Sequence, residues 1–161
     1  MCASVFLIFL LQLGAASAVP VTPASLQYTI YSDGIVLVDY SVIVDALQPR
    51  VNTTLFGKTF SNVLATNEQG ISLDFAISGS TITIDTLGSN RTFISYNTPD
   101  LTNKTGQLWT FSTDSAINST IILPRESTII SLNVAPLSIR DTGGLIELTM
   151  PSGLSEITYM V

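Results

Sequence analysis

The sequence contains no histidine, and its only cysteine is Cys2, close to the N-terminus. The absence of histidine excludes Ser-His-Asp and Cys-His catalysis, imidazole metal sites and pH switches built on imidazole. Without a cysteine beyond residue 2, the rest of the chain has no intrachain disulfide, thiol nucleophile or thiolate metal site. Catalysis that depends on histidine, or on a cysteine beyond residue 2, is therefore excluded.

Charged residues are also scarce. They make up 11% of the chain, against about 25% in typical soluble proteins. The net charge is −6 and there is no basic run, so the electrostatic signature of nucleic-acid binding is absent. Serine and threonine supply most of the polarity, a composition that is common in extracellular β-proteins. With 46% hydrophobic residues, the chain is expected to fold around a proper core.

The first eighteen residues resemble a secretion signal. The apolar run VFLIFLLQL, residues 5–13, is followed by Ala16-Ser17-Ala18, which fits the A-x-A pattern of signal peptidase. The sequence thus predicts a signal peptide over residues 1–18, cleavage before Val19 and no membrane span in the remainder. One feature does not fit a signal peptide: residues 1–4 lack the usual Lys or Arg. The alternative is an uncleaved anchor or a buried strand.

Beyond the leader, residues 19–25 carry two prolines and no charge, and they predict an extended arm. Residues 26–161 then predict a single β-domain. The clearest strand is residues 36–44, in which apolar and polar side chains alternate with a period of two. The predicted core residues share this alternation: Val36, Val38, Tyr40, Val42, Val44, Ile71, Leu73, Phe75, Ile82 and Ile84.

Turn signals recur between such segments along the whole chain. They give roughly ten short strands at the spacing typical of a sandwich or barrel. No segment has the apolar spacing of an amphipathic helix. The fold class is therefore predicted as all-β, an antiparallel, Ig-like β-sandwich, with a barrel as the alternative.

Candidate catalytic and metal-binding groups are few. Asp39 and Asp45 share a strand face but lie roughly 20 Å apart, too far for a glycosidase pair. Asp33-Gly34 and Asp141-Thr142-Gly143-Gly144 indicate turns rather than calcium loops. Trp109 and Phe111 alternate and could form a sugar-stacking platform, although an inward-facing core pair is favoured. We expect no enzymatic activity and assign no catalytic, cofactor-binding or metal-binding residue.

One class of motif remains, the N-x-[ST] sequon for N-glycosylation. A Ser/Thr-rich chain produces single sequons by chance, but four of them behind a secretion signal are more informative. Each falls in or beside a predicted connection, where a glycan does not disturb the core. The predicted glycosylation sites are Asn52, Asn90, Asn103 and Asn118.

The phrases YTIYSDGIVLVDYSV (residues 28–42), TIILPRESTIISL (120–132) and MPSGLSEITYMV (150–161), behind an apolar leader, carry a wider similarity. In texture and order they resemble a group of archaeal cell-surface β-sandwich domains. The resemblance implies display outside the membrane. It implies no activity and no site residues.

These observations predict a secreted or surface-displayed structural or interaction module. Its expected partners are covalent glycans and other cell-envelope proteins or itself. The alternative is a carbohydrate-active enzyme or a sugar-binding module. A sub-case of the first hypothesis is a filament subunit, in which the arm and an edge strand beginning at Leu26 add to a neighbouring sheet.

Overall fold

The computed structural model describes residues 21–161, which form fourteen β-strands and no helix. In that range, nothing has the length and apolarity of a membrane-spanning helix. The all-β prediction is confirmed, with more strands than expected. The predicted signal peptide, residues 1–18, and the first two residues of the arm lie outside the described residues.

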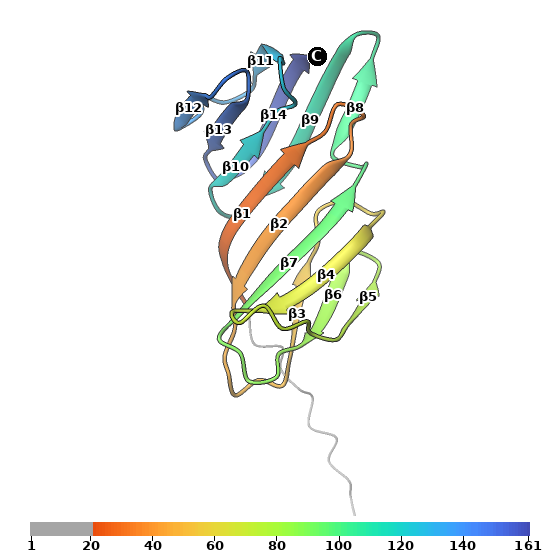
Figure 1. Cartoon of the computed structure of the whole chain (residues 1–161), viewed down its shortest axis with the longest axis vertical. Coiled ribbons are helices and arrows are strands. Elements are labelled where there is room, and N and C mark those ends of the chain that lie inside the picture. Colours follow the sequence, from red (N-terminus) through yellow and green to blue (C-terminus); the bar gives the residue numbers. More distant parts are fainter. Residues whose placement is uncertain (1–20) are drawn as a thin grey trace, which may run out of the picture.

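The largest sheet has seven strands in the order β12-β13-β10-β1-β2-β7-β4. Its strands are β1 (Thr22–Ile30), β2 (Val36–Ile43), β4 (Ser61–Asn67), β7 (Arg91–Thr98), β10 (Ser119–Ile122), β12 (Ser138–Asp141) and β13 (Ile146–Met150). Neighbouring strands are antiparallel except β1 and β10, which run parallel. Figure 1 shows β1, β2, β7 and β4 side by side across the molecule.

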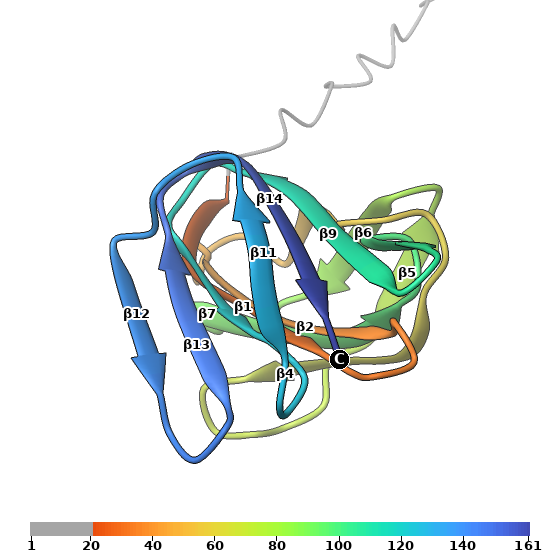
Figure 2. The ribbon, with the colours of Figure 1, turned by 90° about the horizontal axis from the view of Figure 1, so that it is seen from above.

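Two smaller sheets lie behind opposite ends of this large sheet (Figure 1). The four-stranded sheet, in the order β11-β14-β9-β8, consists of β8 (Thr102–Thr105), β9 (Leu108–Ser115), β11 (Thr128–Leu132) and β14 (Gly153–Met160). The three-stranded sheet, in the order β3-β6-β5, consists of β3 (Arg50–Thr54), β5 (Phe75–Ser78) and β6 (Thr81–Asp85). Seen from above in Figure 2, β9 and β14 form a layer separate from β1 and β2. The architecture is a β-sandwich, as the sequence predicted, and not the alternative barrel.

Aromatic side chains join the three sheets inside the sandwich. The hydroxyl of Tyr28 in β1 hydrogen-bonds Thr113 Oγ1 in β9 at 2.8 Å, and burial raises the pKa of this phenol, which stays neutral. The Tyr28 ring packs edge-on against Phe111 of β9 and against Phe56, with centroids 5.2 and 5.7 Å away. Phe56 follows β3 and also meets Tyr40 of β2 at 5.7 Å. One continuous core results.

Eight of the ten predicted core residues are buried. The prediction is wrong for Ile71 and Phe75, which are 56% and 39% exposed. Ile71 lies in the segment that returns from the turn after β4, and only Leu73 of that segment reaches the core. Phe75 belongs to β5, an edge strand whose four residues are all exposed. The alternation correctly indicated a strand here. It did not show that the strand lies at a sheet edge, where little of it is buried.

The prediction for the N-terminal strand is corrected more strongly. The strand begins at Thr22 rather than Leu26, and residues 22–25 pair with β2 instead of forming a free arm. From Gln27 to Thr29 it also pairs with β10, so it lies inside the sheet rather than at its edge. Pro23, which cannot donate a backbone hydrogen bond, is accommodated at a register shift between β1 and β2. The filament sub-case loses the edge strand that it required.

Hydrogen bonds with Tyr96, in β7, and with Asp100, two residues after β7, hold the loop between β3 and β4. Tyr96 accepts a hydrogen bond from the Phe56 N–H at 2.7 Å and donates to the Phe56 carbonyl at 3.2 Å. Asp100 Oδ2 accepts from the backbone N–H groups of Lys58, at 2.7 Å, and Thr59, at 2.5 Å. These two hydrogen bonds lower the pKa of the Asp100 carboxyl below its ordinary value.

Replacing a core residue of β2 tests the strand register. Val42 is fully buried, so Val42→Asp places an unpaired carboxylate in the core and should lower the free energy of unfolding by several kcal/mol. The adjacent Ile43 is 46% exposed, and Ile43→Asp should change stability little. Thermal or urea unfolding measures both. Equal midpoints for the two variants would contradict the register.

Stability should fall as the pH drops below about 4, the pKa of an unfolded Asp. The folded-state pKa of Asp100 is lowered, so its contribution is complete above the unfolded value and is lost as pH falls through the folded value. The pKa of Asp85 is also lowered, because its carboxylate accepts a hydrogen bond from the Arg50 side chain at 2.6 Å. Asp100→Asn should therefore show a shallower acid loss in unfolding midpoints measured from neutral pH downward. An identical acid profile would exclude Asp100 as a contributor.

Candidate functional site

All four sequon asparagines have exposed side chains, as predicted. Asn90 and Asn118 lie in connections, directly before β7 and β10. Asn52 and Asn103 lie within strands, in β3 and β8. Asn103 was expected in a long connection, but the segment forms a short strand paired with β9. Both strands are at sheet edges, so their asparagines remain accessible.

The surroundings of Asn118 and Asn90 show what a glycan would meet. Asn118 Oδ1 accepts a hydrogen bond from the Ser152 N–H at 3.1 Å, and an N-linked glycan attaches at the side-chain nitrogen, which leaves this oxygen in place. The backbone of Asn90 is fixed from both sides, by Val44 at 2.9 Å and Glu68 at 3.2 Å. Thr92, the hydroxyl residue of that sequon, is fully buried and its Oγ1 has no hydrogen-bond partner.

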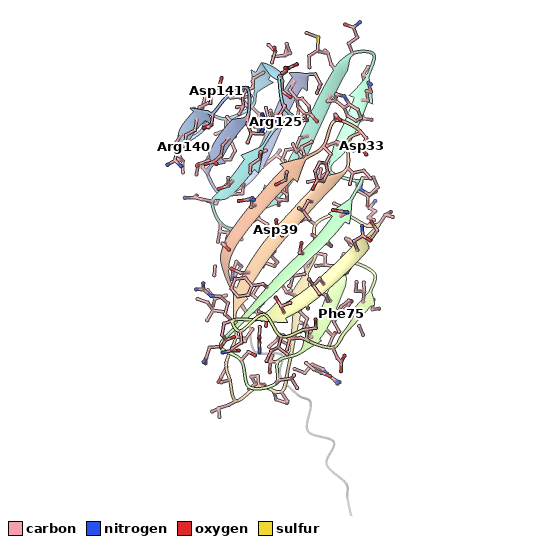
Figure 3. The ribbon with its side chains drawn as sticks, in the orientation of Figure 1. Asp33, Asp39, Phe75, Arg125, Arg140 and Asp141 are labelled. Atoms are coloured by element: carbon pink, nitrogen blue, oxygen red, sulfur yellow. The ribbon has the colours of Figure 1, made fainter. Side chains whose placement is uncertain are left out.

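A groove lies on the outer face of the large sheet, the face turned away from the core. Its volume is about 270 Å³. Its floor comes from alternate, outward residues of β1, β2, β4, β7 and β10, and the polar and aromatic members include Gln27, Asp39, Ser41, Phe93, Ser95 and Thr120. Figure 3 shows Asp39 near the middle of this face. The sheet is thus hollowed here rather than convex.

The groove contains mostly hydroxyl, amide and apolar groups and few ionisable ones. Ser25 Oγ and Ser41 Oγ hydrogen-bond each other at 2.6 Å, and Phe93 is 40% exposed beside them. Asp39 is the single carboxylate among the lining residues. Hydrolysis of a glycosidic bond normally uses two carboxylates, and this groove supplies one. The arrangement offers hydrogen bonds and an apolar ring face, which suit binding more than acid–base chemistry.

The other acidic residues considered as sites fix turns. Asp33 Oδ1 accepts from the Ile35 N–H at 3.0 Å, and Asp141 Oδ1 accepts from the Gly144 N–H at 3.0 Å. Asp45 Oδ1 accepts from the Leu47 N–H at 2.9 Å, in the turn after β2. Within residues 21–161 no three acidic, histidine or cysteine side chains gather where they could hold a metal ion.

The aromatic pair of β9 is mainly a core feature. Phe111 is fully buried and Trp109 is half-buried against the core. The Lys104 ammonium lies 4.9 Å from the centroid of the Trp109 ring. Gly34, with φ of 87°, also lies against this ring, so close that a Cβ there would be 2.3 Å from it. Trp109 therefore does not present the open platform that sugar stacking needs.

The groove could not be found from the sequence, because its residues come from five strands spread between Ser25 and Thr120. Their only signal was polar residues alternating with core residues, which any solvent-facing sheet surface shows. Sequon positions, by contrast, were readable directly from the motif.

No model of a known protein family matches this chain, and no curated protein matches its sequence. The fold is similar to that of the M1 zinc metallopeptidase from Deinococcus radiodurans, with a TM-score of 0.55 and 14% identity over 83% of this chain and 40% of that chain. For the E323A mutant of the same enzyme bound to a Tyr-Ser-Ala substrate, the TM-score is 0.54 and the sequence identity is 16%. The similarity again covers 83% of this chain and 40% of that chain. At this identity the likeness shows the fold alone. This chain spans about 40% of the length of those peptidase chains.

Proposed function

We propose that this chain is a non-catalytic extracellular or cell-surface module, N-glycosylated at Asn52, Asn90, Asn103 and Asn118. The observation that carries the proposal is the exposure of all four sequon asparagines behind an apolar leader with a cleavage pattern. The resemblance to archaeal surface domains supports the same location.

Glycans would also provide something that the bare surface lacks. With 11% charged residues, the surface has few groups that keep molecules apart in solution. Several large hydrophobic side chains are exposed on it, Leu64 and Ile139 among them, at 49% and 56%. Hydrated glycans at four separate positions would reduce contact between such patches.

The likeness to zinc metallopeptidases supports the fold of this module and not a peptidase activity. The similarity covers less than half of those enzymes. Protein zinc sites are built chiefly from histidine, cysteine and carboxylate side chains, and this chain has no histidine. We propose that it uses the sandwich as a scaffold, without metal chemistry.

Intact-mass measurement on protein from the source organism tests the glycosylation. We expect masses above that of the bare chain cut after Ala18, decreasing stepwise when each asparagine is replaced by glutamine. Thr92→Val is a useful companion variant, because it removes the Asn90 sequon while replacing a buried, unpartnered hydroxyl. It should lose one glycan and keep its fold. A mass equal to the bare chain would end the glycan proposal.

A second candidate function, sugar binding, is favoured by the groove on the large sheet. Its hydroxyls, the Gln27 amide and the exposed Phe93 ring match the polar edges and apolar faces of sugars. This candidate places binding on the face of β1, β2 and β7, not on Trp109.

Calorimetric titration with a panel of oligosaccharides tests the groove. Phe93→Ala should weaken binding by about 1 kcal/mol, roughly fivefold, through loss of ring contact. Tyr31→Ala is a matched control, since Tyr31 is similarly exposed, at 44% against 40%, and lies outside the groove. Equal effects of the two variants, or no binding by the parent, would remove this candidate and leave the surface module unaffected.

A further inference from the structure

The three sheets of the described chain have six edge strands: β12 and β4, β11 and β8, β3 and β5. An edge strand presents unpaired backbone groups to which another chain can add, and proteins usually protect such edges with charges, bulges or cover. The six edges differ in whether they carry such protection.

Five of the edges carry a recognisable protection. β12 contains Arg140 and Asp141, and β11 has a register shift between Ile129 and Ser131. β4 has a register shift at one end, and at its other end the returning segment covers it, with the Leu73 N–H bonded to the Ala65 carbonyl at 2.8 Å. The remaining two are β3, with Arg50 and the Asn52 sequon, and β8, with Lys104 and the Asn103 sequon.

β5 has none of these features. Its sequence, Phe-Ala-Ile-Ser, contains no charge, proline or sequon, and it pairs with β6 without a register shift. All four residues are exposed, and no backbone hydrogen bond outside the sheet involves them. Figure 1 places β5 at the outer margin of its sheet, and Figure 3 shows Phe75 at the margin of the molecule.

The geometry points to antiparallel pairing of β5 with β5 of a second copy of this chain, centred on Ala76. In antiparallel sheets, directly opposite residues share a face. A centre at Ala76 places Phe75 opposite Ile77 of the second copy, and Ile77 opposite its Phe75. These side chains lie on the core-facing side of the sheet, opposite Ile84 and Ile82 of β6. Pairing would therefore extend the buried apolar layer across both copies.

The directions of the backbone N–H and C=O groups of β5 also fit this register. Gly79 and Ser80 form a two-residue loop between Ser78 and Thr81, and the residues that flank such a loop are a hydrogen-bonded pair. By alternation, Ala76 also directs its backbone groups toward β6, and those of Phe75 and Ile77 point to the free edge. Phe75 and Ile77 of opposite copies could then exchange both backbone hydrogen bonds. A centre at Ile77 instead places Phe75 opposite Gly79 and loses the side-chain pair.

A second copy suits this edge better than a charged peptide partner would. The strand itself has no charge to attract one, whereas its own sequence is self-complementary in this register. The nearest acid, Asp74, falls opposite Ser78 of the second copy, so the two Asp74 carboxylates lie at opposite ends of the paired strands.

Sedimentation velocity over a concentration series of the exported chain tests the pairing. We expect a monomer–dimer equilibrium that Ala76→Lys weakens several-fold, since the two lysines face each other across the pair. Ser78→Lys is the matched control on the same exposed face of β5. Its lysine lies opposite Asp74 of the second copy, so the dimer should persist. A parent chain that stays monomeric at millimolar concentration, or equal weakening by both variants, would overturn the proposal.

Cysteine cross-linking provides a second measurement that does not depend on a charged substitution. Opposite residues of a non-hydrogen-bonded pair have Cα atoms about 4.5 Å apart, within the range of a disulfide. In the chain cut after Ala18, which lacks Cys2, Ala76→Cys should form disulfide-linked dimers on mild oxidation, and Ser78→Cys should form far fewer. Equal cross-linking at both positions would contradict the Ala76-centred register.

Discussion

The large sheet must bury one face from β13 to β4, and the rest of the structure follows from that requirement. Its inner face carries fully buried residues from Tyr28 in β1 to Met150 in β13. Neither small sheet is wide enough to cover it alone, so one covers each end and the aromatic group around Tyr28 and Phe56 fills the junction. The loop that carries Phe56 is fixed by Tyr96 and Asp100 because the junction depends on that ring.

Dividing the second layer into two sheets also creates more edges than a simple sandwich has. The chain protects five of these edges: β12, β3 and β8 carry charged residues, and β11 and β4 have register shifts or cover. Both ion pairs of residues 21–161 involve an edge strand: Arg140 of β12 pairs with Glu147 at 3.5 Å, and Arg50 of β3 pairs with Asp85 at 2.6 Å. In a protein with six basic residues in all, edge protection by charge alone was not available at every strand.

The sequence predicted the local features and missed the long-range ones. β2 was readable because its alternation is uninterrupted, and sequon exposure followed from polar motifs. The parallel pairing of β1 with β10 was not readable, since it joins Gln27 to Thr120 and no local pattern specifies a partner so distant. The same limit explains why β1 was expected at an edge, and why Ile71 and Phe75 were assigned to the core. A strand's periodicity shows that it has two faces, but not whether another layer covers either.

The remaining surface restricts how this molecule can recognise anything. Its ionisable groups are few, and the carboxylates with identified partners mostly fix turns or loops, as Asp33 and Asp100 do. Electrostatic steering over long range therefore contributes little to its associations. Two features act at short range: the hydroxyl, amide and ring groups of the groove, and the open backbone of β5. Because hydrogen bonds and apolar contacts act only at contact distance, binding to this module should depend on shape and strand register, and only weakly on ionic strength.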